Sequence, residues 1–416
     1  MEKTEGFYIM MLFILSTMWC FADTIPDVKC IEIALVKKGY ENITIFTRSD
    51  TLFVDAENRL YRWYPKAYAD MIEIIMPFTL RKTTVCLTIL RQGIPMVMLT
   101  LPKLAWEDGM NGKLNREAFS SLLQTTLNIS SGRRKEFRQT GANTFFNKID
   151  LVVYPQVKIQ LGNWDDPFKS QFNLAPAFEI SFLRGMNMMA QVIIPLQNDL
   201  EPNGNTIRPG LITISQTMRF PHNFFGTVSV GYFTRNRYGI NAEARKFFLN
   251  GKINLGLNGG LTGYAELIDQ QWTYSTVNLF TWFADAAYRW ARYDLTLKAG
   301  YGNFLNGSAG WRMDAYRQFR EVTIGFFALE TDGFLNGGFY FSIPLPPGKY
   351  STQHALRIRP ESYFSWEYRA RGMSEAGRSY STGNSLSDLF HNINPDYLKQ
   401  NVINSLYFNF QNIEKK

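Results

Sequence analysis

The chain has 416 residues and a formal net charge of +8 at pH 7; this length excludes a single small domain and suggests two or three units. Hydrophobic residues make up 45% and aromatic residues 15% of the sequence, yet the mean hydropathy is only -0.19, a combination that fits a β-barrel with an apolar outer wall and a polar lumen better than a soluble core. The positive charge favours anionic partners such as lipid head groups or acidic polysaccharide, whereas the lack of a long run of like charges argues against a nucleic-acid-binding tail.

Residues 1–22 are predicted to be an export signal. Lys3 precedes an apolar run from Phe7 to Trp19, and Cys20 to Ala22 offer a cleavage site before Asp23. Cys20 also suggests a lipidated anchor, although the bulky Trp19 before it fits a lipidation site poorly. No later stretch has the roughly 20 apolar residues that a membrane-spanning helix needs, so any membrane insertion depends on strands.

An exported chain can form disulfides, and Cys30 and Cys86 remain after the signal is removed. A disulfide between them and two separately packed thiols are both compatible with the sequence, because spacing alone does not show whether their Cα atoms approach one another.

Residues 27–102 are predicted to form a small α/β domain. Apolar residues at helical spacing precede Gly39, which is suited to a helix C-cap, and Gln92-Gly93 is suited to a hairpin turn. The expected helices are 28–38 and 66–76, and the expected strands are 42–47, 51–56, 83–90 and 96–101. Residues 103–149 are polar, with a basic cluster at 132–135, and we interpret them as a linker or an entry to the barrel.

From residue 150 to residue 416 the hydrophobic period changes to two. In the clearest run, Tyr293 to Tyr301, apolar and aromatic residues alternate with polar residues or glycine, as in a barrel strand with aromatics at both membrane interfaces. Similar runs give about fourteen strands, with twelve to sixteen within the error of such boundaries. The last expected strand is 405–411, where Leu406, Phe408 and Phe410 alternate with polar residues. The fold class is therefore predicted to be mainly β: an antiparallel transmembrane barrel with a small N-terminal α/β domain in the periplasm.

Charged residues recur on the polar face of these strands. A soluble β-sandwich would also alternate, but it could not bury such charges cheaply in its core. We therefore expect a set of charges that line the lumen of a barrel: Lys158, Glu179, Glu243, Arg245, Asp294, Lys298, Arg357 and Arg359.

The sequence offers little for catalysis. Its three histidines, His222, His354 and His391, stand apart from one another and do not resemble a metal cluster. Only His354 lies in an expected strand, and no serine nucleophile can be identified beside it. The acidic pair Asp165-Asp166 lies in an expected loop. We predict a protein that is not an enzyme and that uses no metal or cofactor.

Several short stretches resemble the YjbH/GfcD-like family. In the N-terminal domain they are 39–43, 50–54, 57–62 and 91–95; in the strand-rich region they are 231–239, 242–245 and 260–264. Together the matches extend over roughly residues 30 to 345, although the exact motifs are short.

This resemblance implies an outer-membrane barrel that assists the export or assembly of exopolysaccharide or capsule, together with periplasmic export proteins. It implies no catalytic residues. Members of the family are usually much longer, which implies a reduced barrel here, or a wall completed by another copy or another chain. The alternatives are a general porin for small solutes and a barrel enzyme acting on lipid or glycan.

Overall fold

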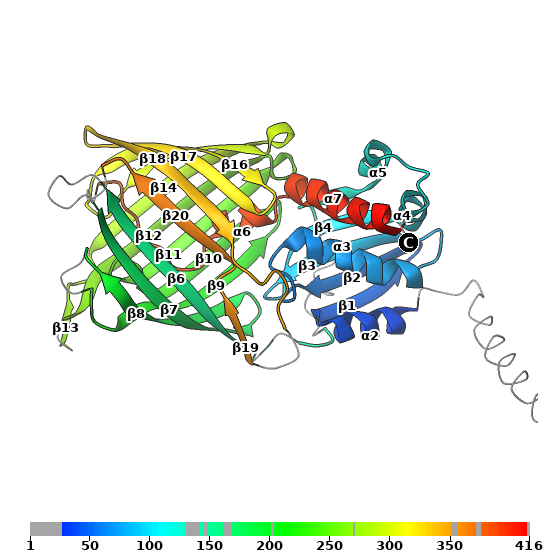
Figure 1. Ribbon diagram of the computed structural model, residues 1–416, viewed down its shortest axis with the longest axis horizontal. Coiled ribbons are helices and arrows are strands. Elements are labelled where there is room, and N and C mark those ends of the chain that lie inside the picture. The colour runs from blue at the N-terminus through cyan, green and yellow to red at the C-terminus, as the bar shows by residue number, and fades with distance from the viewer. Residues whose placement is uncertain are drawn as a thin grey trace, which may run out of the picture.

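The computed structural model describes residues 27–129, 141–144, 146, 148–161, 168–200, 204–268, 271–351, 356–371 and 376–413, with the side chains of 407–413 omitted. The expected export signal, the basic cluster 132–135, Asp165-Asp166 and His354 lie outside these residues. The described chain forms a five-stranded and a fifteen-stranded sheet. The expectation of a mainly β protein with a small N-terminal α/β region is thus confirmed (Figure 1).

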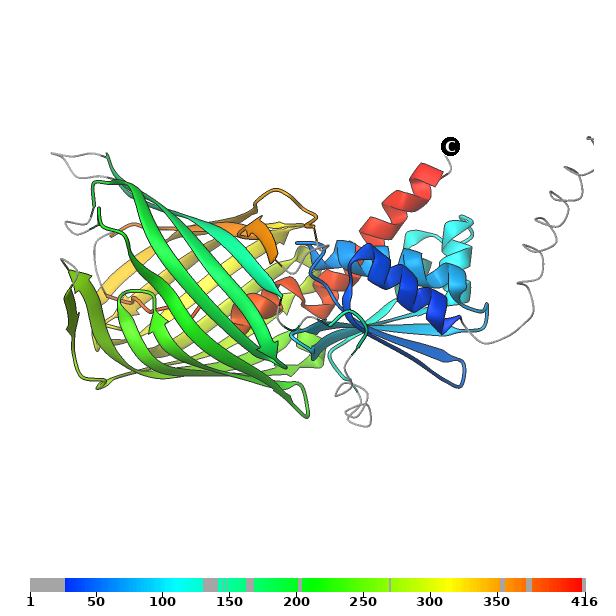
Figure 2. The same ribbon diagram turned by 90° about the horizontal axis from the view of Figure 1, so that it is seen from below.

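The N-terminal domain is a mixed sheet with helices packed on one face (Figure 2). Its helix α2 ends at Gly39, which adopts the left-handed conformation expected of a C-cap (φ 111°). The parallel pair β2 and β3 is connected by α3, whereas the other pairs are antiparallel. The elements are α2 (Val28–Lys38), β1 (Glu41–Arg48), β2 (Thr51–Glu57), α3 (Tyr64–Ile75), η1 (Met76–Phe78), β3 (Thr84–Arg91), β4 (Ile94–Pro102), α4 (Lys103–Met110), α5 (Arg116–Leu122) and β5 (Gln124–Thr126).

This domain is longer than the sequence suggested. Residues 103–126, part of the predicted linker or barrel entry 103–149, contain α4, α5 and β5 instead, and β5 is the fifth strand of the sheet. The side chain of Asn115 caps α5 by accepting a hydrogen bond from the Ala118 N–H, so the helix has a recognisable N-cap signal.

The large sheet curls round on itself (Figures 1 and 2). From β6 to β18 each strand of the main path pairs antiparallel with the next, and the two ends of the path, β19 and β20, follow one another in the chain. The strands are β6 (Ile149–Leu161), β7 (Phe168–Leu183), β8 (Met186–Asn198), β9 (Arg208–Phe220), β10 (Phe224–Phe233), β11 (Arg237–Phe248), β12 (Ile253–Ile268), β13 (Gln271–Tyr274), β14 (Leu279–Trp290), β15 (Leu295–Asn303), β16 (Ala309–Phe319), β17 (Val322–Thr331), β18 (Phe334–Pro344), β19 (Leu356–Pro360) and β20 (Tyr363–Arg369). The 3-10 turns η4 (Leu249–Gly251) and η5 (Ala291–Tyr293) join strands at the end nearest the N-terminal domain.

The C-terminus departs from the expected strand. Residues 405–411 belong to α7 (Pro395–Ile413), which follows α6 (Leu386–Asn392) and packs against α3 of the N-terminal domain. Leu398, Val402 and Leu406 are buried one helical turn apart. The predicted terminal strand is therefore wrong, because this 3.6-residue period outweighs the short alternation at 406–410.

Candidate functional site on the inner face of the large sheet

The two faces of the large sheet differ sharply in polarity. We call the face that encloses α6 the inner face. On β11, Asn241, Glu243 and Arg245 are buried on the inner face, whereas Ile240 is 47% exposed on the outer face. The same alternation on β14 buries Asp285 and exposes the residues on either side of it. The strand period therefore carries charged groups inward and apolar groups outward, as the sequence indicated.

Arg245 is the centre of a buried ion-pair network. Its guanidinium donates two hydrogen bonds to the carboxylate of Asp285, with N–O distances of 3.0 and 2.9 Å. The ammonium of Lys298 lies 3.5 Å from the same carboxylate, and Arg245 also donates to Asn254. Pairing of this kind is what allows charges to be buried, because an isolated buried charge is very costly.

Arg289 forms a second pairing close by. It donates to Gln318 Oε1 at 2.7 Å and to Asp294 Oδ1 at 2.8 Å, and its side chain is 5% exposed. Its Nε atom is buried without a hydrogen-bond partner among the described residues.

The chain after β20 returns through the space that the large sheet encloses. The ring of Tyr380 stacks on Phe233 with centroids 5.2 Å apart, and its hydroxyl accepts a hydrogen bond from Asn241. Backbone hydrogen bonds join Arg378 to Leu305 and Ser381 to Thr234. We call residues 376–394 the inner segment, since they are held by inner-face groups of several strands.

Helix α6, the end of the inner segment, is fixed to the wall by polar contacts. The Glu243 carboxylate accepts hydrogen bonds from the N–H groups of Leu386 and Ser387, at 2.8 and 3.2 Å. A carboxylate in this position satisfies helix donors that would otherwise lack partners. The ring of Phe390 packs on Phe225 and Phe247, so α6 is held by apolar contacts as well.

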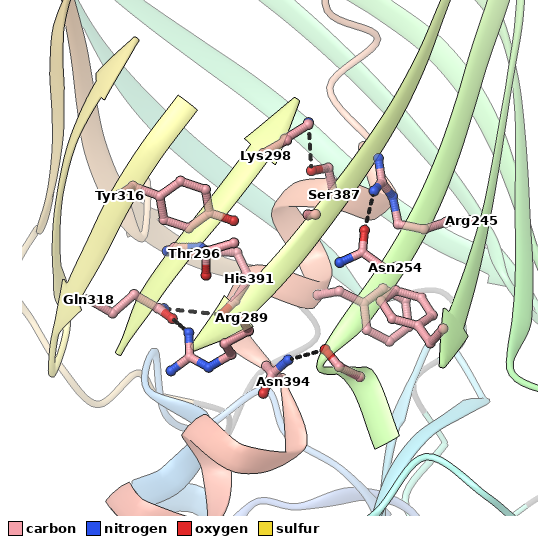
Figure 3. Close-up of a pocket in the computed structure, with 14 residues that line it drawn as sticks. Arg245, Asn254, Arg289, Thr296, Lys298, Tyr316, Gln318, Ser387, His391 and Asn394 are labelled. Carbon is pink, nitrogen blue, oxygen red and sulfur yellow. Dashed lines mark hydrogen bonds between the residues drawn. The ribbon is translucent and has the colours of Figure 1, made fainter. Parts of the chain in front are cut away.

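A small pocket lies between α6 and the wall. Figure 3 shows its polar lining, which comes from β11, β12, β14, β15, β16 and α6 and from Asn394, which follows α6. His391 Nε2 lies 2.8 Å from Thr323 Oγ1, and Lys298 lies 3.4 Å from Ser387 Oγ. The pocket offers hydrogen-bond donors and acceptors to a polar ligand.

A second charged cluster lies where the large sheet meets the N-terminal domain. The Asp150 carboxylate on β6 pairs with Arg357 and Arg359 on β19, and with Arg59 from the N-terminal domain. Arg359 also pairs with Glu179 at 3.1 Å. One buried carboxylate thus joins two neighbouring strands to the domain beside them.

Arg62 and Trp63 make further contacts between the N-terminal domain and the rest of the chain. Arg62 pairs with Glu321 at 2.8 Å. Trp63 donates to the Tyr397 hydroxyl at 2.7 Å, and that hydroxyl donates to the Arg320 carbonyl at 2.8 Å. The indole of Trp63 also lies under the Arg320 guanidinium, 4.6 Å away. These contacts link α3, α7 and the turn between β16 and β17.

Six of the eight predicted lumen charges belong to these two clusters. Glu243, Arg245 and Lys298 lie together around Asp285, whereas Glu179, Arg357 and Arg359 lie together around Asp150. Lys158 is exposed on the same face of β6 as Asp150. Asp294 is not a strand residue: it lies in the left-handed conformation after η5, where it accepts from Arg289. Residues at positive φ are common where strands end. The alternation of polar and apolar residues did not reveal that Asp294 has this conformation.

Sequence reasoning missed Asp150, Asp285 and Arg289. Asp285 and Arg289 alternate with apolar residues in β14, so the same period-two pattern contains a signal for them. The polar residues of the inner segment had no such signal, because their position depends on the path of the chain after β20.

The two cysteines of the described chain are thiols, and no disulfide joins them. Cys30 is exposed on α2 and Cys86 is buried in β3. The alternative of two separately packed thiols therefore holds.

Comparison with known proteins gives no assignment. No family model matches the chain, and no curated protein matches it significantly. Among the described helices, none has the length and apolar character required to cross a membrane. The described part of the chain also contains no group of three or more His, Cys, Asp or Glu side chains that could hold a metal ion.

Proposed function

We propose that residues 149–371 form a transmembrane β-barrel in a bacterial outer membrane, and that the protein assists the export or assembly of a surface polysaccharide without catalysing a reaction. The N-terminal domain would lie in the periplasm. The observation that carries the proposal is the inverted polarity of the large sheet, with charges inside and apolar side chains outside.

The outer face supports contact with lipid. Large apolar side chains are exposed on strand after strand, among them Leu257 (53%), Phe280 (60%) and Phe326 (64%). Exposed apolar surface on a water-soluble monomer is normally limited to patches of a few hundred Å². An apolar outer band that faces the acyl chains explains why these residues need no protein partner.

An aromatic belt supports the same orientation. At the end of the large sheet nearest the N-terminal domain, exposed aromatic side chains come from β9, β11, β14, η5 and β16: Phe220, Phe248, Tyr288, Trp290, Tyr293 and Phe319. Three cations lie over rings of this belt: Lys246 over Phe248, Arg292 over Tyr293 and Arg317 over Phe319. Aromatic rings and long cationic side chains are typical of the membrane–water interface.

The inner segment argues against a general porin. Porins keep a water-filled lumen, whereas here residues 376–394 lie within the large sheet and bond to its inner face.

The polysaccharide assignment rests on the resemblance to the YjbH/GfcD-like family and on the polar inner face. Serine, threonine and asparagine side chains line the inner sides of β9 to β12, among them Ser215, Ser229 and Asn241. Hydroxyl and amide groups are suited to hydrogen bonding with sugars.

The proposal is tested by deleting the gene in its host and measuring surface polysaccharide, with the purified full chain examined in planar bilayers. We expect the deletion strain to lose surface polysaccharide, the wild-type gene to restore it, and the bilayers to show little steady conductance. Unchanged polysaccharide combined with a large, open, salt-like conductance would instead identify a porin.

A further inference from the structure

The hydrogen-bond ladder between β19 and β6, which would close the large sheet, stops partway along β6. β19 pairs parallel with the first part of β6, from Leu356 opposite Ile149 to Pro360 opposite Val153. One more backbone hydrogen bond follows, from Glu361 N–H to the Val153 carbonyl at 2.9 Å. Beyond it, in the described residues, β6 pairs only with β7 and β20 pairs only with β18. We call the boundary between residues 154–161 of β6 and β20 the seam.

Pro155 accounts for the point at which the ladder ends. The carbonyl of Val153 faces β19, and in a strand the residue two positions later presents its backbone groups on the same side. The next donor on this edge would therefore belong to residue 155. Proline has no N–H, so the parallel ladder loses its next hydrogen bond there.

Unpaired strand edges are costly in a bilayer. Each backbone group without a partner costs several kcal/mol in a lipid environment. If the large sheet spans a membrane, the seam is therefore the weakest line of its described wall, since the other neighbouring strands are joined by ladders.

The two surfaces of β20 differ in chemistry. On its outer side, Trp366 and Tyr368 pack with Phe339 of β18, with ring centroids 6.0 and 5.4 Å from Phe339. On its inner side, Glu367 pairs with Arg369 at 2.7 Å and with Arg312 at 2.9 Å. The seam is thus bordered by aromatic rings outside and by ionic groups inside.

The base of the seam is fixed. Asp150 ties β6 to Arg357 and Arg359 of β19 and to Arg59 of the N-terminal domain. Strands β6 and β20 can therefore separate only beyond the cluster, toward the end away from that domain. The route along the barrel axis is occupied by the inner segment, which leaves the seam as the alternative way into the polar interior.

We propose that the seam is a lateral gate for an amphiphile whose acyl chains stay in the bilayer while its polar head group enters the barrel between β6 and β20. The gate closes when β20 pairs with β6 in the register begun by β19. This inference rests on the membrane-embedded barrel proposed above and names the class of molecule that reaches its interior.

The test locks the gate with a disulfide. Extended five residues beyond Pro360, the register of β19 on β6 would place Lys158 opposite Ser365, so the locking variant is Lys158→Cys with Ser365→Cys. The matched control is Ile214→Cys with Val230→Cys, a directly opposed pair on the outer face of the permanently joined strands β9 and β10. The full chain is reconstituted in phosphatidylethanolamine–phosphatidylglycerol vesicles with a trace of phospholipid that carries a photoreactive head group, and crosslinks are mapped by mass spectrometry.

We expect head-group crosslinks to inner-face residues beside the seam in the wild type. Oxidation should abolish them in the locking variant, reduction should restore them, and the control should keep them throughout. Crosslinks confined to the outer face, crosslinks unaffected by the lock, or failure of the locking disulfide to form would each overturn the gate. Because this readout involves no polysaccharide, it separates the gate from the export function.

A second variant tests the role of Pro155. Pro155→Ala restores an N–H on the seam side of β6, so the ladder can extend and the yield of inner-face crosslinks should fall without oxidation. An unchanged or higher yield would count against the gate as described.

Discussion

Asp150 and Asp285 show how a carboxylate is buried in this protein, since each pairs with basic side chains. Asp150 is 5% exposed and is surrounded by three guanidinium groups. Removal of one member of such a cluster leaves an uncompensated charge that water solvates poorly. Breaking a buried ion pair therefore destabilises the folded state by more than forming the pair stabilises it. The cluster also lies at the junction of the N-terminal domain and the large sheet, so it determines how the two parts are joined.

Glu57 in the N-terminal domain is a contrasting case. Its carboxylate accepts hydrogen bonds from the backbone N–H groups of Gln92 and Gly93, the turn between β3 and β4. Burial outweighs these bonds and raises the pKa of Glu57 to about 7. The Gln92 carbonyl in turn accepts from the Gly185 N–H of the large sheet, so the turn that Glu57 binds also contacts the large sheet.

This raised pKa predicts a pH dependence of stability. The folded state holds the Glu57 proton up to about pH 7, whereas an unfolded chain loses it near the ordinary pKa of 4.5. The contribution of protonated Glu57 to the free energy of unfolding is therefore complete below pH 4.5 and is lost as the pH rises to about 7. Its upper limit is roughly 3 kcal/mol. Thermal unfolding of the full chain in detergent should show wild type losing stability relative to Glu57→Gln between pH 5 and 7. A difference between the two proteins that does not change over this window would contradict the assignment.

At the scale of single elements, the strands of the large sheet were predictable and their ends were not. The alternation between Ile240 and its neighbours is enforced by the strand period, so β11 could be recognised locally. Asp294 was misplaced because a turn with a residue at positive φ interrupts the same pattern.

The C-terminal helix shows how a local pattern can mislead. Alternation at 406–410 suggested a strand, yet the helical spacing of Leu398, Val402 and Leu406 was also present. Asn394 accepts hydrogen bonds from the N–H groups of Asp396 and Tyr397 at the start of α7, so the sequence Asn394-Pro395 carried a helix-start signal. The helical period decides the structure because a helix with this spacing buries its apolar face against α3.

The outer face of β12 gives a prediction for a single strand. Leu257 lies well inside β12, whereas Leu249 lies in η4 at the end of the large sheet; both side chains are exposed. Arginine on a lipid-facing surface costs about 2–4 kcal/mol at the bilayer midplane and about 0–1 kcal/mol near the interface. In urea unfolding of the full chain in vesicles, Leu257→Arg should therefore be strongly destabilising and Leu249→Arg nearly neutral. Equal effects of the two variants would argue that the outer face does not contact lipid.

At the scale of the whole molecule, the features that depend on long-range strand pairing could not be predicted from the sequence. The parallel contact between β19 and β6 joins residues about two hundred positions apart, and no local pattern indicates it. The path of the inner segment is equally non-local, since it depends on where β20 ends and on the inner-face groups available to bind it. Period and composition therefore indicated a curled, mainly β architecture, while the filled interior and the seam required the structure.

The central claim is that lipid surrounds the large sheet, and it can be measured with single cysteines. A bimane label would be attached at Leu174, Ile240, Leu257, Phe280 or Ile324, which are exposed on the outer faces of different strands, and at Ile33 of α2 as an exposed control in the N-terminal domain. The labelled full chain would then be placed in vesicles of brominated phospholipid. We expect strong quenching at every position on the large sheet and little at Ile33. Quenching no stronger on the sheet than at Ile33, or confined to one sector of the wall, would contradict the membrane-embedded barrel.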